Sequence, residues 1–247
     1  MADAAPVLVA CAHGTRAPAG RRTMALLRLD VAAARPGLEV VAAHLDVHKP
    51  ALDDVVARLA AAGRRMVIVP LLLSSGYHVR VDVGRAAALA TGGLARPAAA
   101  LGPEPVLVDI LQQRLAECGA GRDDAIVMAA AGSSDPRATA DVELTVRWLS
   151  ELRAAPVRAA YLAAASPTVP EAVAAMRREH PGRAVTVATY LLAPGLFSAR
   201  LDAAGADRVA APLAPHPALA RLVLARFDEA VARVPAPAGP AAGVGAV

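Results

Sequence analysis

The chain has 247 residues, of which 56% are hydrophobic, 19% are charged and only 2% are aromatic, and its formal net charge is +4. This apolar fraction excludes a disordered chain, and no run approaches the roughly 18 uninterrupted apolar residues that a membrane-spanning helix needs. Two cysteines are too few for a disulfide scaffold, and no basic segment precedes the first apolar stretch, so we predict a cytoplasmic protein without a signal peptide or a membrane partner.

The sequence repeats one pattern twice. Each copy has an apolar run closing on a small-residue turn, a helical stretch, an apolar run closing on proline, an apolar run closing on glycine, and a proline-flanked helix start. In the first copy these segments are 7–14, 23–34, 40–50, 67–76 and 101–105. In the second copy they are 125–132, 141–152, 157–167, 185–195 and 213–217. The nearly constant spacing between matching segments predicts an internal duplication.

Within each copy, short apolar strands alternate with amphipathic helical segments. One such helix is indicated by Val55, Val56 and Leu59, which share a helical face and are followed by Gly63. This alternation is typical of βαβ units with a parallel sheet covered on both faces. We therefore predict an α/β fold of two tandem flavodoxin-like domains, each a parallel sheet of about four strands flanked by helices. The domains would cover residues 1–120 and 121–234, and a Pro/Ala/Gly tail would cover 235–247.

Polar residues follow the first three predicted strands of the first copy. His13 follows the first strand, Asp46 the second, and Ser75, Gly76 and His78 the third. Ligands of open parallel sheets bind at the carboxyl ends of the strands. Two imidazoles and a carboxylate at this edge suit a first-row divalent metal, and they also suit proton transfer near neutral pH. A histidine at a strand end, taken alone, is more often a hydrogen-bonded turn residue, but together on one sheet edge these residues favour a functional site.

The second copy serves as an internal control for these residues. The positions opposite His13, Asp46 and His78 hold Ala131, Ala163 and Phe197. The glycines and prolines that shape the turns are present in both copies. We therefore predict one working site per chain, in the first domain.

The basic residues favour a small anionic ligand over a nucleic acid. Lys49 is the only lysine among 26 basic residues, an arginine bias that codon usage also explains. Arginine binds carboxylates and phosphates in a planar, two-point contact. The arginines are dispersed and aromatic residues are few, which argues against a nucleic-acid partner. Because Pro50 follows Lys49, the sequence has no nucleotide-binding P-loop.

The first half resembles the sirohydrochlorin chelatases, the cobaltochelatases and ferrochelatases of the ATP-independent class II. Three pieces carry the resemblance: the strand that runs into His13-Gly-Thr-Arg16, the Leu45-Asp46 to Pro50 segment, and residues 69–79 with Asp82. The resemblance is strong over about residues 7–116 and weak over the second half. It matches the long, internally duplicated form of the family, which implies a chelatase-like domain in each half and predicts a monomer.

The resemblance also implies an activity and roles for individual residues. His13 and His78 would bind the metal and, with Asp46, form the catalytic set; the family often has glutamate where this chain has Asp46. The implied reaction is a lyase-type insertion of a divalent metal substrate into sirohydrochlorin, a tetrapyrrole polycarboxylate, without ATP or any other nucleotide. Fe²⁺, which gives siroheme, is preferred slightly over Co²⁺ for cobalamin biosynthesis. Substrate-binding candidates close to the motifs are Arg16, Arg80, Arg85, Ser75 and Gly76.

Alternatives to this assignment stay open at the level of sequence. The same residues would serve a non-catalytic metal or tetrapyrrole carrier, and a regulatory or structural homologue would bind no metal. His44, inside an apolar run, is expected to be a hydrogen-bonded core or surface histidine, whereas His48 lies beside Asp46 and is a candidate helper. Cys11 shares a sheet face with His13, but we expect it to act as a small buried hydrophobic residue.

Overall fold

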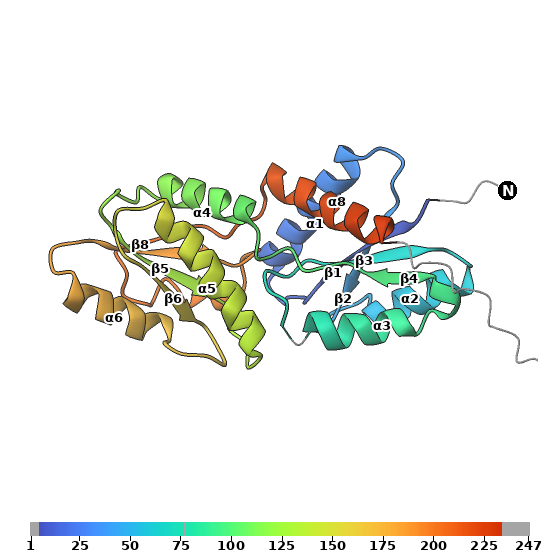
Figure 1. Cartoon of the computed structure of the whole chain (residues 1–247), viewed down its shortest axis with the longest axis horizontal. Coiled ribbons are helices and arrows are strands. Elements are labelled where there is room, and N and C mark those ends of the chain that lie inside the picture. The colour runs from blue at the N-terminus through green and yellow to red at the C-terminus, as the bar shows by residue number, and fades with distance from the viewer. Residues whose placement is uncertain (1–4, 77, 234–247) are drawn as a thin grey trace, which may run out of the picture.

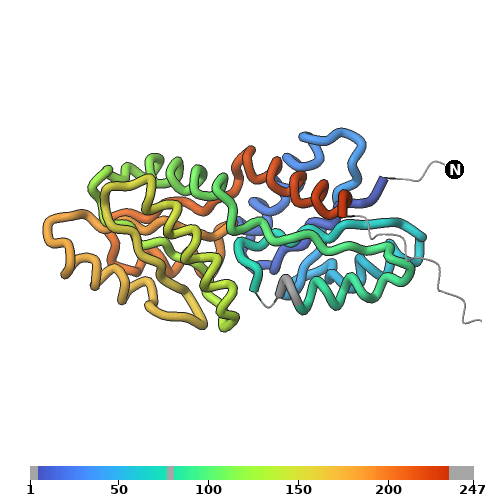
Figure 2. Tube along the Cα trace, viewed as in Figure 1, coloured from blue at the N-terminus to red at the C-terminus, as the bar shows by residue number. Residues whose placement is uncertain are grey.

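The computed structural model describes the chain over residues 5–76 and 78–233, without the side chains of residues 78–80. Two lobes lie side by side, and each contains a four-stranded parallel sheet covered by helices (Figures 1 and 2). The first sheet has the order β2-β1-β3-β4 and is formed by β1 (Val7–Ala12), β2 (Val40–His44), β3 (Met66–Pro70) and β4 (Ala95–Pro97). The second has the order β6-β5-β7-β8 and is formed by β5 (Ala125–Ala130), β6 (Val157–Tyr161), β7 (Val185–Tyr190) and β8 (Arg208–Val209). The predicted fold of two similar parallel α/β units is confirmed.

Helices connect the strands in both lobes. The longer ones are α1 (Pro18–Ala34), α2 (Leu52–Ala61), α4 (Pro105–Glu117), α5 (Pro136–Glu151), α6 (Val169–Glu179) and α8 (Pro217–Ala232). The shorter ones are the π-helix η1 (His78–Val83), α3 (Gly84–Ala88), the 3₁₀ turn η2 (Thr91–Gly93) and α7 (Leu196–Ala199). Proline stands at the start of α1, α4, α5 and α8, where its fixed φ suits a helix and no backbone donor is lost. No helix in the described ranges is both long and apolar enough to cross a membrane.

The central strands are buried because the sheets are covered on both faces. Every residue of β1 and of β5 is buried. Cys11 in β1 is 0% exposed, as expected for a small core residue, and burial raises the pKa of its thiol to about 12. A continuous apolar run therefore marks a central strand of this fold.

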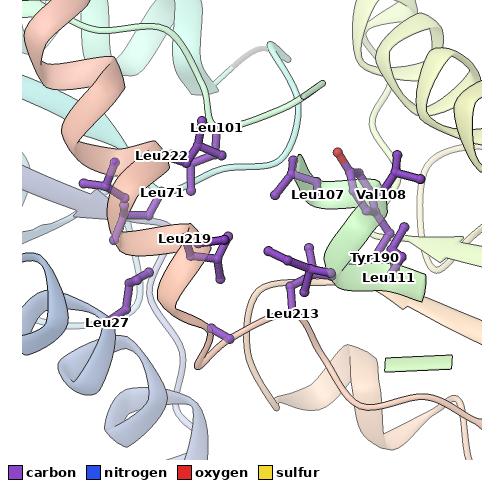
Figure 3. Close-up of a cluster of buried hydrophobic side chains, with 14 of the residues drawn as sticks. Leu27, Leu71, Leu101, Leu107, Val108, Leu111, Tyr190, Leu213, Leu219 and Leu222 are labelled. Carbon is purple, nitrogen blue, oxygen red and sulfur yellow. The ribbon is translucent and has the colours of Figure 1, made fainter. Parts of the chain in front are cut away.

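The last helix of each repeat packs on the lobe formed by the other repeat (Figure 1). Helix α4 contacts β7 and α5 of the second lobe, whereas α8 contacts α1 and β3 of the first. One apolar cluster consequently runs from Leu27 and Leu219 in the first lobe to Leu111 in the second (Figure 3). The boundary near residue 120 separates the two sequence repeats. In space, each lobe includes the last helix of the other repeat.

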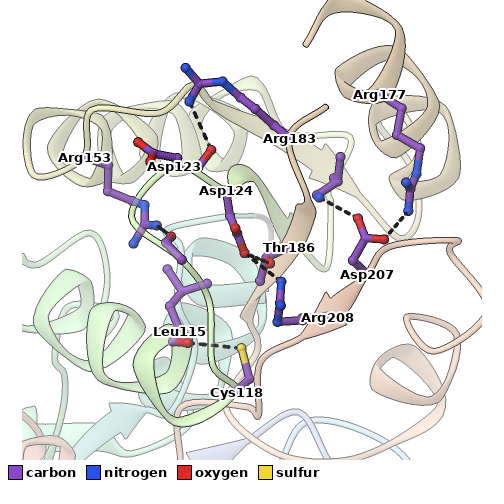
Figure 4. A network of polar contacts seen from close by, with 12 residues as sticks. Leu115, Cys118, Asp123, Asp124, Arg153, Arg177, Arg183, Thr186, Asp207 and Arg208 are labelled. Atoms are coloured by element: carbon purple, nitrogen blue, oxygen red, sulfur yellow. Dashed lines mark hydrogen bonds and ion pairs between the residues drawn. The ribbon is translucent and has the colours of Figure 1, made fainter. Parts of the chain in front are cut away.

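A polar network ties the strands of the second lobe at their amino ends (Figure 4). Asp124 accepts hydrogen bonds from the Thr186 hydroxyl at 2.8 Å and from Arg208 at 3.1 Å. Asp207 accepts one from the backbone of Val185 at 2.7 Å, and this bond is the main reason why the pKa of Asp207 is lowered. These carboxylates hold the end of the sheet that lies opposite the carboxyl ends of its strands.

Candidate functional site

The carboxyl ends of both sheets open into a cleft of about 1300 Å³ between the lobes. From the first lobe it is lined by the turn after β1, the end of β2 and the segment after β3. The equivalent turns after β5 and β7 line the opposite side. The lobes are also joined beside it, because the Tyr190 hydroxyl of β7 donates a hydrogen bond to the Leu73 carbonyl oxygen at 3.1 Å. The cleft is therefore bounded by two fixed walls.

His13 lies in the turn after β1 and lines the cleft with an exposed side chain. The turn requires Gly14, whose φ is +104° and whose missing Cβ would collide with the carbonyl oxygen of Asp46. The Asp46 backbone N–H donates to the His13 carbonyl oxygen at 3.0 Å. These contacts hold the His13 backbone against the loop that follows β2.

The second lobe repeats this turn without its histidine. Gly132 has a φ of +88°, and the Ala163 N–H donates to the Ala131 carbonyl oxygen at 3.0 Å. Ala131 and Ala163 therefore occupy the places of His13 and Asp46, as the sequence alignment of the two copies predicted. The backbone of this turn forms equally well without the polar side chains.

Part of the predicted metal site lies outside the described residues. The backbone of His78 begins η1, but its side chain and that of Arg80 are not among the described side chains. In the part of the chain that is described, no three His, Cys, Asp or Glu side chains are grouped to hold a metal ion. The convergence of His13 and His78 on one ion stays a prediction.

The side chain of Asp46 is not brought to the cleft with His13. The Asp46 carboxylate accepts a hydrogen bond from the Val47 N–H at 2.6 Å and lines a separate hollow of about 260 Å³ together with Asp53 and Arg85. The reason is local: β2 ends at His44, and Val47 turns the chain with a φ of +72°. The strand alternation that would place Asp46 beside a cleft residue therefore does not continue to it.

The residues predicted to bind the substrate lie in three different places: the cleft, the smaller hollow and the contact with α5. Arg16 and Gly76 line the cleft. Arg85 instead pairs with Asp53 at 2.8 Å and lies at the smaller hollow, so its contact with the substrate stays a prediction. Ser75 donates from its backbone N–H to Asp141 of α5 at 2.7 Å, and its hydroxyl donates to the same carboxylate oxygen. Ser75 thus fastens the segment before His78 to the second lobe.

Sequence reasoning missed most of the charged wall of the cleft. Besides Arg16, the cationic residues that line it are Arg21, Arg22, Arg28 and Lys49. All of them belong to the first lobe, and no Asp or Glu is among the described lining residues. The second-lobe lining consists of Ala, Gly, Leu, Ser, Thr, Tyr, Val, Pro and Phe. The available signal was the helical spacing of Arg21, Ala25 and Arg28, which places them on one face of α1.

Two further histidines line the cleft next to this wall. His44 is only 5% exposed and its Nδ1–H donates to the Pro50 carbonyl oxygen at 3.2 Å, which fits the expected hydrogen-bonded core histidine. Its ring centroid lies 3.8 Å from that of His48. Burial lowers the pKa of His44, and the charges of His48 and Arg28 lower it further. His44 is therefore neutral at pH 7, where its imidazole carries no charge into the cleft.

Both repeats of the chain match the model of a known protein family. The family model for CbiX matches residues 7–118 and again residues 125–230. The chain belongs to the CbiX family. The two matches coincide with the two sequence repeats, so both halves are copies of the CbiX unit. No curated protein matches the chain.

Solved structures similar to this CbiX-family chain share its two-lobed fold. SirB from Bacillus subtilis with Fe3+ has a TM-score of 0.74 and 20% identity over 92% of this chain and 96% of its own. SirB from Bacillus subtilis subspecies spizizenii in complex with cobalt has a TM-score of 0.71 and 18% identity, covering 91% and 94%. A CbiX described as the terminal enzyme for biosynthesis of siroheme in denitrifying bacteria has a TM-score of 0.67 and 22% identity, covering 91% and 99%. At these identities the likeness concerns the fold.

Proposed function

We propose that this chain is a sirohydrochlorin chelatase that inserts a divalent metal into the tetrapyrrole without ATP. The observation that carries the proposal is the asymmetry of the cleft: its described residues form a cationic wall without carboxylates on one lobe and an uncharged wall on the other. A flat apolar ring with an acidic rim is complementary to both walls. Membership of the CbiX family and the fold shared with SirB support the same substrate.

The size and charge of the cleft suit a macrocycle. Its volume of about 1300 Å³ exceeds that of the usual small-ligand site, which is roughly 300–1,000 Å³. Leu191, Leu192 and Phe197 of the second lobe supply apolar surface for a ring face. Arg16, with the arginines of α1, supplies guanidinium donors for peripheral carboxylates. Both kinds of contact would hold the ring between the lobes.

In the proposed reaction the metal is a substrate that passes from the protein to the ring. His13, with His78, would hold the ion through neutral imidazole nitrogens and leave its other positions open, so the ion can be released. As each pyrrole N–H bond breaks, its electron pair forms a metal–nitrogen bond, and the two protons leave to water or to a basic group of the cleft. The metal keeps its oxidation state throughout. Because Asp46 lies at the separate hollow, no proton is routed through it.

We propose Fe²⁺ as the physiological metal, with Co²⁺ as the competing one. Support for iron comes from the two-lobed architecture shared with SirB and with the CbiX described as a siroheme enzyme. The SirB structures with Fe3+ and with cobalt are the reason to test both metals. A tetrapyrrole carrier is the second candidate, because the same two walls would bind a ring that is never metallated.

The test is anaerobic metal insertion followed by absorbance, with sirohydrochlorin in excess over protein and either Fe²⁺ or Co²⁺ as the metal. We expect many equivalents of product per chain, and a loss of at least about a hundredfold in rate for H13A and for H78A. H180A is the matched control, because His180 ends α6 and is not among the cleft-lining residues. Product that stops near one equivalent would favour the carrier, and an unchanged rate in H13A and H78A would refute the assignment.

A further inference from the structure

Arg28 is a guanidinium in the cleft wall that has no counter-ion among the described residues. It lies on the cleft-facing side of α1, is partly buried, and makes no hydrogen bond or ion pair with another described residue. Burial lowers its pKa. A partly buried charge is normally compensated by a partner, since removing it from water costs free energy. The unpaired Arg28 guanidinium can therefore bind an anion from outside the chain.

The described residues that line the cleft with Arg28 include polar groups but no Asp or Glu. The positive charge of Arg28 helps to lower the pKa of His44. The ring of His44 is tilted by 38° against that of His48, with the ring centroids 3.8 Å apart. The Nδ1 atom of His48 is buried and has no hydrogen-bond partner within the described part of the chain. Because that atom is not exposed to the cleft, the charged group that a ligand meets in this corner is the Arg28 guanidinium.

The second lobe shows that the fold does not need these polar groups. Helices α1 and α5 both begin at proline, so Arg28 corresponds to Val146. Strand pairing aligns Ala12 with His44 in one sheet and Ala130 with Tyr161 in the other, so Tyr161 takes the place of His44. Four residues further along, Ala165 takes the place of His48. The second lobe forms the same elements around a valine, a tyrosine and an alanine.

We propose that Arg28, flanked by His44 and His48 in the cleft wall, forms a carboxylate-binding subsite that orients the tetrapyrrole in the cleft. This subsite rests on the proposed function for the identity of its ligand. Arg28 binds one peripheral carboxylate through a two-point contact. The acidic rim of the ring therefore lies toward α1 of the first lobe, and a ring face lies against the uncharged wall of the second.

The test uses the full chain and two metal-free ligands that share a ring: uroporphyrin I, which is a polycarboxylate, and its neutral amide derivative. Binding is followed by fluorescence titration for wild type, R28Q and the matched control R178Q. Arg178 lies exposed on α6 and is not among the cleft-lining residues. For R28Q we expect about a tenfold increase in Kd for uroporphyrin I, as for loss of one charge-assisted contact, and no change for the amide. R178Q is expected to bind both ligands like wild type.

Two results would overturn the subsite. One is equal binding of uroporphyrin I by R28Q and wild type; the other is an equal loss for the amide, which would mean that Arg28 only shapes the cleft. Should R28Q fail to fold, R28K takes its place: it keeps the charge but lacks the two-point contact, and about threefold weaker binding of uroporphyrin I alone is expected. Wild-type metal insertion, measured separately, reports on the proposed function. If the wild type inserts no metal but R28Q still binds uroporphyrin I more weakly, the proposed function fails and the subsite stands. If the wild type inserts metal and R28Q binds uroporphyrin I unchanged, the subsite fails and the proposed function stands.

Discussion

Replacing Asp141 with alanine tests how the segment that precedes His78 is held in place. One oxygen of the Asp141 carboxylate accepts hydrogen bonds from both the backbone N–H and the hydroxyl of Ser75, across the boundary between the lobes. Both donors are partly buried. D141A removes both acceptor contacts at once, whereas S75A removes only the hydroxyl and leaves the backbone bond of 2.7 Å.

The expected magnitude follows from these contacts. A hydrogen bond to a charged group contributes about 1.5–3 kcal/mol, and partial exposure to water reduces this for each of the two bonds. We therefore expect D141A to lower the free energy of unfolding by about 2 kcal/mol and S75A by about 1 kcal/mol. For a chain of this length, about 2 kcal/mol corresponds to a fall of roughly 4–8 °C in Tm. Urea unfolding followed by circular dichroism measures both variants.

The double variant S75A/D141A gives the sharper check. Since both substitutions remove the same contact, the double variant should be no more than about 0.5 kcal/mol less stable than D141A alone. We also expect D141A to slow metal insertion, because the segment leading to His78 loses its anchor. Additive losses, or a D141A variant as stable as wild type, would show that Asp141 does not fasten this segment.

Two more predictions concern the turns and the pairing of helices. Gly14→Ala, and the matched Gly132→Ala in the second lobe, should each lower the free energy of unfolding by at least about 2 kcal/mol in urea, because a Cβ would collide with a carbonyl oxygen at a positive φ. A wild-type midpoint in either variant would contradict this account of the turn. Arg35 of α1 binds Asp228 of α8 at 2.6 Å and 2.7 Å, and this hydrogen bonding lowers the pKa of Asp228. The stabilisation is present at neutral pH and lost as pH falls below about 4 through the lowered pKa, so D228N should show a smaller loss of stability than wild type between about pH 5 and pH 3.

Part of the candidate site followed from residue order alone. The apolar runs 7–12 and 125–130 became central strands, because parallel strands that are covered on both faces are continuously hydrophobic. His13 directly follows the first of them, and strand ends of a parallel sheet share an edge, so its place at the cleft needed no side-chain information. The paired turn glycines then made the two copies comparable position by position.

The direction of side chains that follow a strand could not be predicted from the sequence. Asp46 and His44 are two residues apart, yet one caps a turn at the smaller hollow and the other lines the cleft. The difference arises because the chain leaves the extended conformation after His44, at a point that apolar patterning does not mark. The position of Arg85 could not be predicted for a similar reason, since its partner Asp53 is brought to it by the packing of α2 against α3.

The sequence by itself determined the duplicated α/β units, the order of their strands along the chain, and the presence of His13 in one copy only. These features depend on contacts between near neighbours and on the period of the hydrophobic pattern. The exchange of α4 and α8 between lobes and the cationic wall around Arg28 were decided only by the tertiary structure. Both depend on which surfaces meet when two similar lobes pack together. Local patterns of residues within either lobe do not predict which surfaces those are.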